Sequence, residues 1–316
     1  MLDPDQARFL DVWTSAWAGL SPTAGWDEQR AFHEELADRL LDPALRDVPE
    51  RLVLVPFAGR YVPVRLFDGA PDTAAARPCL VYLHGGGWVR GSSTTNRYVA
   101  AALARANRQV VASVDYSLAP EQQFPVPVEE SIAATRWIFA NAATLDIAAR
   151  AIAIGGDSAG GNLAAAVALA LRGSDCGLIA QWLVYPVVDF DTTRPSYSAM
   201  AAVAGLPRSR MEDYSALYCP RPEDRAQERA APLRAASLAG LPPAFVGVAE
   251  NDILRDEGAA FRAALEAAGV QVTFDPGLGL AHGYMLAADS CAPARAARDA
   301  GFRWLADRNA QALAGR

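Results

Sequence analysis

The chain of 316 residues is 52% hydrophobic and 21% charged, which is the composition of a folded globular protein. This length accommodates one large α/β core or two smaller domains. The formal net charge is −7, and no concentrated basic run occurs in the sequence. Because phosphate binding needs a basic face, these features exclude nucleic acid as an expected partner.

No segment of the sequence is predicted to cross a membrane. The longest stretch of small apolar residues, 163–171, is far shorter than the ~20 residues that a span requires, so it predicts a buried helix. The first residues, MLDPDQARFLDVW, carry acids where a secretory signal carries basic residues, and no apolar segment follows them. We therefore expect the protein to reside in the cytoplasm.

The cysteines lie far apart and show no C-x-x-C spacing; they are Cys79, Cys176, Cys219 and Cys291. In a reducing compartment such cysteines are expected to be free thiols. The spacing also gives no reason to expect a structural zinc site. We predict no bound metal.

The first 41 residues predict two helices. Asp3 and Pro4 are typical of a helix start, with a capping carboxylate and then proline at the first helical position. Apolar residues follow on one face of this helix, namely Phe9, Leu10, Trp13, Trp17 and Leu20. The second helix is predicted from Trp26 to Leu41, before Pro43. Residues 51–67 then predict two extended strands around a turn at 58–60.

After Pro78 the sequence alternates between β-rich apolar runs and helical patterns. The runs are CLVYLH, QVVASVDY, AIAIGG, GLIAQWLVYP, AFVGVAE and VQVTFDP, and the predicted helices lie near 96–107, 128–140, 162–171 and 256–268, with a last helix that ends near Leu313. This alternation is typical of a parallel sheet with crossover helices, so the predicted fold class is α/β. Residues 189–242 are rich in prolines and turns, and we interpret them as an insertion in the core.

Residues 156–160, GDSAG, fit the pattern G-x-S-x-G, which places a nucleophilic serine on a sharp turn between a strand and a helix. The serine of this pattern is Ser158. The pentapeptide alone is equally compatible with an ordinary glycine-rich turn in an alanine-rich chain. The context of an apolar strand before it and a helix after it favours the nucleophile.

A nucleophilic serine needs a base within hydrogen-bonding reach, and the sequence contains three histidines. His33 falls in the second predicted helix, and His84 opens a glycine loop, where a structural hydrogen bond is expected. His282 follows the last predicted strand, at the sheet edge where ligands of open α/β sheets bind. We therefore predict that His282 is the base.

The base needs a carboxylate that orients its ring and stabilises the imidazolium. Glu250, Asp252 and Asp256 all lie at one strand end, and helix capping is the alternative role for each of them. We predict Asp252 as the acid, because it gives the chain order serine, acid, histidine that is known for α/β serine hydrolases.

The stretch HGGGW at 84–88 predicts an oxyanion hole. At Gly86 and Gly87 the lack of side chains lets backbone N–H groups approach a tetrahedral oxygen, and the N–H of Ala159 after the serine joins them. Such a loop can also cradle a phosphate. However, neither a following Gly-Lys-Ser/Thr nor G-x-G-x-x-G spacing is present, so we expect no nucleotide cofactor.

Taken together, these motifs resemble the hormone-sensitive-lipase-like branch of the α/β-hydrolases, which includes many bacterial carboxylesterases. The resemblance covers the chain from about residue 50 onward and rests on HGGGW (84–88), DYSLAPE (115–121), FPVPVEE (124–130), GDSAGGNLAAA (156–166), YPVVDF (185–190), DILRDEG (252–258) and HGY (282–284). Two positions depart from the family pattern: Ser117 stands where arginine is common, and Ile253 where proline is common. We expect these departures to affect local packing and not catalysis.

The resemblance implies an α/β-hydrolase fold, with a mostly parallel central sheet flanked by helices and covered by a helical cap. It places the catalytic domain at 46–316 and builds the cap from residues 1–45 and an insertion at about 190–230. It also implies an oxyanion hole of Gly86, Gly87 and Ala159, and Asp252 as the triad acid. A homodimer through an edge strand or the last helix is a further expectation.

The predicted activity is ester hydrolysis through an acyl-enzyme on Ser158, without a metal or organic cofactor, and the family resemblance implies short- to medium-chain acyl esters as substrates. Four residues are expected to contact the small-molecule ester: Trp13, Trp88, Tyr185 and Asp189. Hydrolysis of amides, lactones or carbamates would use the same site and stays an alternative. A non-catalytic small-molecule receptor on the same fold is a second alternative, which the intact triad disfavours.

Overall fold

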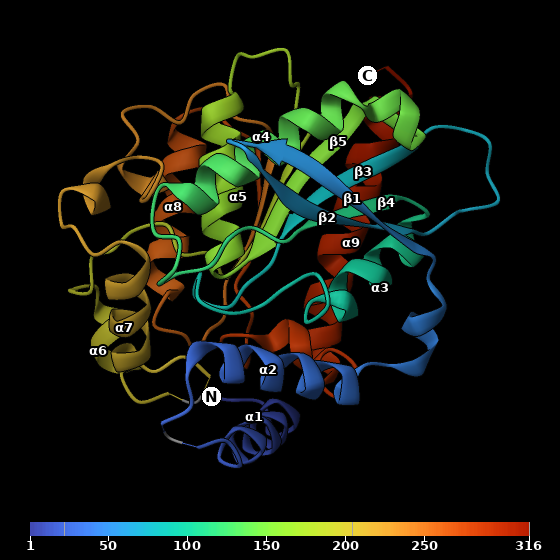
Figure 1. Cartoon of the computed structure of the whole chain (residues 1–316). Coiled ribbons are helices and arrows are strands. Elements are labelled where there is room, and N and C mark those ends of the chain that lie inside the picture. Colours follow the sequence, from blue (N-terminus) through green and yellow to red (C-terminus); the bar gives the residue numbers. More distant parts are fainter. Residues whose placement is uncertain (22, 204, 316) are drawn as a thin grey trace.

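The computed structural model describes residues 1–21, 23–203 and 205–315, and its centre is a sheet of eight strands flanked by helices (Figure 1). The strand order is β1-β2-β4-β3-β5-β6-β7-β8. The strands are β1 (Glu50–Phe57), β2 (Arg60–Asp68), β3 (Arg77–Leu83), β4 (Val110–Val114), β5 (Ile147–Asp157), β6 (Gln181–Val184), β7 (Ala244–Gly247) and β8 (Val272–Asp275). From β4 to β8 all neighbours run parallel, which confirms the predicted α/β class.

The antiparallel start of the sheet is a hairpin. β1 pairs with β2 from Glu50↔Phe67 to Phe57↔Arg60, and β2 then pairs antiparallel with β4. Ala58 and Gly59, which join the two strands, both have positive φ, at 46° and 79°. Positive φ at both central residues is the requirement of a tight hairpin turn, and it explains why the chain reverses here.

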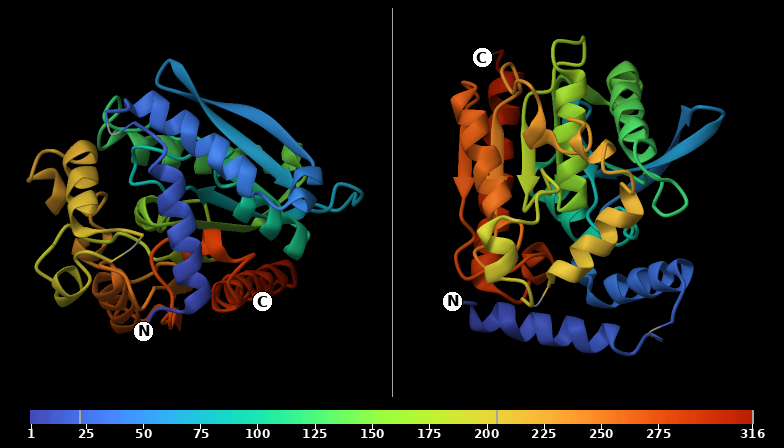
Figure 2. Two further views of the ribbon diagram at one scale, coloured as in Figure 1. Left: turned by 90° about the horizontal axis from the view of Figure 1, so that it is seen from below. Right: turned by 90° about the vertical axis from the view of Figure 1, so that its left-hand side faces the viewer.

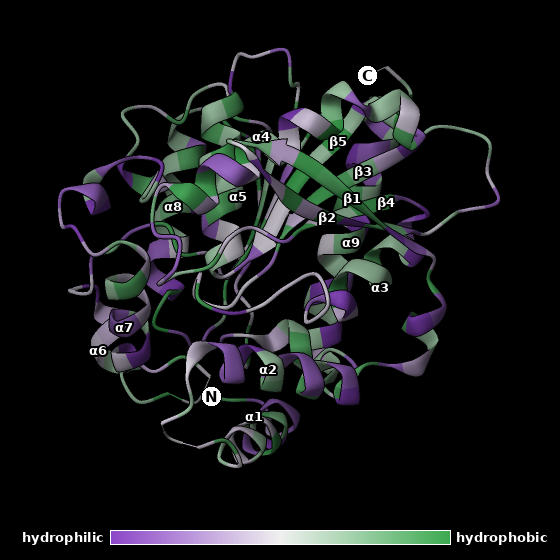
Figure 3. Cartoon of the chain, viewed as in Figure 1, coloured by the Kyte–Doolittle hydropathy of each residue, from purple (hydrophilic) through white to green (hydrophobic). Residues whose placement is uncertain are grey.

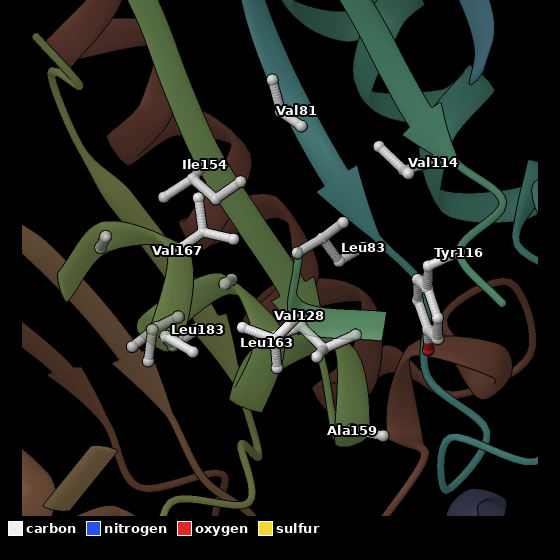
Figure 4. Close-up of a cluster of buried hydrophobic side chains, with 14 of the residues drawn as sticks. Val81, Leu83, Val114, Tyr116, Val128, Ile154, Ala159, Leu163, Val167 and Leu183 are labelled. Carbon is white, nitrogen blue, oxygen red and sulfur yellow. The ribbon is translucent and has the colours of Figure 1, made fainter. Parts of the chain in front are cut away.

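Helices cover both faces of the parallel strands. They are α3 (Arg97–Asn107) and α9 (Ala292–Leu313) on one face, and α4 (Val126–Ala140), α5 (Ala159–Leu171) and α8 (Arg255–Ala267) on the other. Because side chains alternate along a strand, Leu80 and Tyr82 of β3 join the α3–α9 core while Val81 and Leu83 join the opposite core. Figure 4 shows part of that second core, where Val167 of α5 lies beside Ile154 of β5.

Helix α5 begins earlier than the sequence predicts, at Ala159 instead of residue 162. Gly160 and Gly161 disfavour a helix in isolation. Here both are buried, against Leu83 of β3 and against Pro186 respectively, in space that a side chain would overfill. Tertiary packing therefore overrides local propensity at the start of this helix.

Four further helices lie at the end of the sheet toward which the parallel strands point. They are α1 (Pro4–Trp17), α2 (Trp26–Leu40), α6 (Pro195–Ala199) and α7 (Arg208–Tyr218), and short 3-10 turns occur at Pro43–Asp47, Ala142–Leu145, Asp224–Ala226, Pro232–Arg234 and Tyr284–Ala287. In the right-hand view of Figure 2 the strand arrows point down toward blue α1 and α2, with gold α7 beside them. Segments far apart in sequence thus gather at one end of the sheet.

The central strands and the helices at the end of the sheet differ in hydropathy. In Figure 3, strands β3 and β5 and helix α5 are largely hydrophobic, whereas α2 and α7 alternate between hydrophobic and hydrophilic residues. In the part of the chain that the structure describes, no helix is both long enough and apolar enough to span a membrane.

Candidate active site

Ser158 lies on a strained turn between β5 and α5. Its backbone has φ 55° and ψ −119°, a conformation that residues with side chains rarely adopt. The surrounding structure holds it there, because the Ser158 N–H donates to the Val184 carbonyl at 2.9 Å and its carbonyl accepts from Asn162 N–H at 3.1 Å. This is the geometry of a nucleophile elbow, in which the hydroxyl stands clear of both the strand and the helix.

His282 and Asp252 complete a hydrogen-bonded series with Ser158. Ser158 Oγ lies 2.8 Å from His282 Nε2, and His282 Nδ1 lies 2.7 Å from Asp252 Oδ2. Asp252 is fully buried, and its other carboxylate oxygen accepts the N–H of Leu254 at 3.0 Å. The loops after β7 and β8 supply the acid and the histidine, so three strand ends bring these side chains together.

The two other carboxylates considered for the acid lie elsewhere. Glu250 Oε2 accepts the N–H of Gly279 at 2.9 Å, and Asp256 Oδ2 accepts the N–H of Ser196 at 2.8 Å. Both therefore fix backbone segments. Of these three carboxylates, only Asp252 contacts the imidazole of His282.

The glycine loop after β3 adopts a conformation and a packing that require glycine at two positions. Gly86 and Gly87 have φ of 124° and 63°, and a Cβ on Gly86 would overlap the Arg90 carbonyl while one on Gly87 would overlap the Tyr214 ring. Within the described part of the chain, the N–H groups of Gly86, Gly87 and Ala159 donate no hydrogen bond. They are available to a ligand.

Asp157, which precedes the serine in GDSAG, ties this loop to the elbow. Its Oδ1 accepts from Tyr82 OH at 2.5 Å, from the Gly85 N–H at 2.9 Å and from Asn96 Nδ2 at 3.2 Å. Burial raises the pKa of this carboxyl, and the Tyr82 hydrogen bond opposes the rise. The signal for its role was its place beside the serine, but its partners come from β3, from the loop after β3 and from the residue before α3, and no local pattern reveals them.

Ser158 and His282 open into a cavity of about 580 Å³. One wall, which we call the floor, consists of the loop 85–88, Asp157, Ser158, Tyr185 and His282. The other wall, which we call the roof, comes from α1, α2, α7 and the segment before α7, and includes Phe9, Trp13, Trp17, His33, Met211 and Tyr214. Aromatic rings dominate the roof, where Trp13 lies 6.2 Å from Phe9 and 6.1 Å from Trp17.

Three of the four residues predicted to contact substrate line this cavity. Trp13 belongs to the roof, and the Tyr185 ring lies 4.7 Å from the His282 ring. Trp88 lines the cavity but is fully buried, because its ring stacks on Tyr218 at 4.3 Å.

Asp189, the fourth residue predicted to contact substrate, is not part of the cavity lining. Its carboxylate is buried and pairs with Arg194 at 3.0 Å and Arg234 at 2.6 Å. The chain has already left the strand end by this point, so Asp189 anchors the following segment instead of meeting a ligand. A residue that follows a strand does not necessarily line the cavity, because the chain can turn away from the strand end.

The two remaining histidines are structural neighbours of the site. Burial, with a smaller contribution from Arg90, lowers the pKa of His33 to about 3, and the ring packs between Trp13 and Trp17. His84 Nδ1 lies 2.9 Å from the Gly85 carbonyl, as its expected structural role requires, and its ring stacks on Tyr116 at 4.2 Å. Burial lowers the pKa of His84.

Ser117 and Ile253, which depart from the family pattern, are both accommodated by their local surroundings. The N–H and Oγ of Ser117 donate to buried Glu130 at 2.6 Å and 2.9 Å, and Arg60 from the hairpin turn pairs with the same carboxylate at 2.5 Å. Ile253 is fully buried beside Asp252. Neither residue contacts Ser158 or His282.

The cysteines are free thiols, as predicted, and all four are buried. Within the described ranges, no group of three or more His, Cys, Asp or Glu side chains lies close enough together to hold a metal ion.

Comparison with known proteins agrees with this architecture. A profile of the alpha/beta hydrolase fold matches residues 80–286. The chain is 40% identical over 231 residues to Carboxylesterase NlhH of Mycobacterium tuberculosis, which covers 71% of both proteins. It is 34% identical over 294 residues to the ethyl acetate hydrolase of Pseudomonas putida, which covers 90% of this chain and 92% of that protein.

Solved structures give the same result. The thermostable carboxylesterase EstE1 from a metagenomic library superposes with a TM-score of 0.84 at 35% identity, covering 92% of this chain and 99% of that one. The hyperthermophilic esterase of Pyrobaculum calidifontis superposes with a TM-score of 0.86 at 30% identity, covering 99% of each chain. The chain therefore belongs to the alpha/beta hydrolase fold family, in its hormone-sensitive-lipase-like branch.

Proposed function

We propose that the protein is a carboxylic ester hydrolase that works through an acyl-enzyme on Ser158. The observation that carries this proposal is the unbroken series from Ser158 Oγ through His282 to Asp252, with both hydrogen bonds between 2.7 and 2.8 Å. The names of the relatives, a carboxylesterase and an ethyl acetate hydrolase, support the ester bond as the target.

In the first step, His282 Nε2 takes the Ser158 proton as the oxygen attacks the acyl carbon, and Asp252 stabilises the imidazolium. The carbonyl oxygen becomes an oxyanion that accepts hydrogen bonds from the N–H groups of Gly86, Gly87 and Ala159. His282 then returns the proton to the leaving alcohol. In the second step water attacks the acyl-enzyme with the same base, releasing the acid and restoring Ser158.

In this proposal, residues 1–45 and about 190–230 form a cap over the catalytic domain at 46–316. The roof is the surface of this cap that lines the cavity. The aromatic contacts of Phe9, Trp13 and Trp17 support this role, because they enclose the end of the cavity opposite Ser158 with apolar surface. A volume of about 580 Å³ suits short- to medium-chain acyl esters.

The test is hydrolysis of a p-nitrophenyl acyl series from acetate to palmitate by the wild type and by Ser158→Ala, with mass spectrometry after an alkyl phosphonate probe. We expect a burst of p-nitrophenol, an optimum at short to medium chains and a covalent adduct on Ser158 that is absent from the variant. A folded wild type with neither turnover nor adduct would overturn the proposal. A ligand bound tightly and recovered unchanged would then favour a receptor.

Amide, lactone and carbamate bonds are chemically accessible to the same residues. Matched ester and amide substrates with one acyl group distinguish them, and we expect the ester to be hydrolysed faster by the wild type.

We also propose that the protein acts in the cytoplasm and forms a homodimer. The four unpaired thiols support a reducing compartment, and β8 is a half-buried edge strand that a second copy can cover. Cell fractionation tests the first statement, and light scattering at micromolar concentration tests the second. A monomeric mass at that concentration would contradict the dimer.

A further inference from the structure

The walls of the cavity carry more positive than negative charge, although the whole chain is acidic at −7. Arg90 and Arg210 are the basic side chains of the lining, and Asp157 is its acidic one. Asp157 is buried and already accepts hydrogen bonds from four groups, three on Oδ1 and the Tyr185 hydroxyl on Oδ2. The charge that a ligand meets in the open part of the cavity is therefore that of the two arginines.

Arg90 is fixed at the junction between the floor and the roof. Its N–H donates to the Gly86 carbonyl at 3.2 Å, so its backbone is one turn beyond the proposed oxyanion hole. Its guanidinium carbon lies 4.6 Å from the Trp17 ring and 5.8 Å from the Tyr214 ring. The guanidinium thus makes cation–π contacts with rings from α1 and α7, and these contacts use none of its N–H donors.

Neither arginine has an anionic partner in the protein. Among the described residues, the guanidinium groups of Arg90 and Arg210 form no ion pair and no hydrogen bond. The neighbouring Arg30 differs, because it pairs with Glu121 at 2.7 Å and donates to the Val89 carbonyl at 2.9 Å. Arg30 therefore has an anionic partner in the protein, whereas Arg90 has none among the described residues.

We propose that the enzyme accepts esters that carry a second, ionised carboxylate, and that Arg90, assisted by Arg210 on α7, binds this carboxylate while Ser158 attacks the ester. The planar guanidinium matches a carboxylate in shape and charge. This inference rests on the ester-hydrolase function proposed above and adds a substrate class to it. The carboxylate can belong to the acyl half or to the alcohol half of the ester.

The test compares two pairs of esters that differ only in a terminal carboxylate replacing a methyl group. Monomethyl adipate is compared with methyl hexanoate for the acyl half, and 4-acetoxybutanoate with butyl acetate for the alcohol half. For each pair, the measured quantity is the ratio of kcat/KM for the charged ester to kcat/KM for the neutral one. We expect this ratio to be at least one in the wild type for one or both pairs.

Arg90→Gln is expected to lower that ratio tenfold or more, since a charge-assisted hydrogen bond is lost, and Arg210→Gln to lower it less. The matched control is Arg303→Gln, which removes an exposed arginine on α9 outside the cavity lining and should leave the ratio unchanged. Raising the salt concentration should lower the wild-type ratio, because ions screen the attraction. The salt series needs no variant, so it stands even if Arg90→Gln fails to fold.

Equal ratios in wild type, Arg90→Gln and Arg210→Gln for both pairs, without salt dependence, would show that Arg90 only stacks on the roof and would overturn the inference. Hydrolysis of the neutral esters in that experiment would leave the proposed function intact. Failure to hydrolyse all four esters and the p-nitrophenyl series would overturn both proposals together.

Discussion

The floor and the roof of the cavity are held in place by different forces. Hydrogen bonds between buried polar groups fix the floor, as in the contacts of Asp252 with His282 and of Asp157 with the Gly85 N–H. Ring packing and cation–π contacts hold the roof, as between Trp17 and Phe32 at 5.1 Å. Hydrogen bonds depend steeply on direction, whereas ring contacts tolerate shifts. We therefore expect floor variants to lose turnover and roof variants to change selectivity.

The largest effect is expected from Asp252→Asn, which changes the carboxylate that contacts His282 of the floor. The amide cannot stabilise the imidazolium and favours the wrong tautomer of His282, so kcat should fall by roughly 10⁴-fold. Steady-state hydrolysis of p-nitrophenyl butyrate measures this loss. Glu250→Gln is the matched control, because its carboxylate lies on the same loop but does not contact His282. Losses of similar size in both variants would show that Asp252 has no special relation to the histidine.

The next effect concerns Glu257 of α8, which is fully buried outside the cavity lining. Its Oε1 accepts the N–H of Val188 at 2.8 Å, and burial raises the pKa of its carboxyl to about 8. Because the folded-state pKa lies above the unfolded value, the folded protein holds this proton more tightly. The resulting stabilisation is complete below about pH 4 and is lost as the pH rises through 8.

Between pH 6 and pH 9, the wild type should therefore lose on the order of 2 to 3 kcal/mol of unfolding free energy through Glu257. Glu257→Gln stays neutral and should lack this loss in urea denaturation at the two pH values. Glu266→Gln, an exposed change on the same helix, should keep the wild-type slope. A Glu257→Gln variant as pH-sensitive as the wild type would contradict the assignment.

Asp157→Asn tests whether the elbow positions the oxyanion loop. With the carboxylate gone, the Gly85 N–H is held less firmly and the donors that follow it are less well aligned. We expect kcat to fall by roughly 10- to 100-fold and KM to change much less. Tyr82→Phe removes a different partner of the same carboxylate and leaves the Gly85 contact, so its kcat should fall less. A rise in KM with unchanged kcat would mean that Asp157 acts on binding alone.

The smallest effect is expected in the roof. Trp17→Leu should enlarge the cavity and shift the ratio of octanoyl to acetyl hydrolysis toward the longer ester by a few-fold, because ring packing contributes only modest and non-directional energy. Trp137→Leu on α4, outside the cavity lining, should leave this ratio unchanged. A loss of turnover for every chain length after Trp17→Leu would remove the distinction between roof and floor.

The difference between floor and roof also explains which parts of the site could be predicted from the sequence. Ser158, His282 and the glycine loop each follow a strand, and strand order places them at one edge of the sheet, so local patterns were sufficient to bring them together. Asp189 also follows a strand, but its partners Arg194 and Arg234 come from the insertion, whose path no periodicity records. The contacts of Arg90 with Trp17 and Tyr214 depend on two helices separated by about 190 residues. Such contacts required the structure.

Three consecutive residues at the end of β5 serve three separate parts of the site. Asp157 holds the glycine loop, Ser158 faces the histidine, and Ala159 presents a free N–H at the start of α5. Covalent geometry sets their mutual spacing, so it does not depend on how α1 or α7 packs. The serine and its two neighbours are in this sense aligned by the chain itself. Grafting the first 45 residues or the insertion of a relative onto this chain should change which molecules enter without requiring the chemistry to be rebuilt.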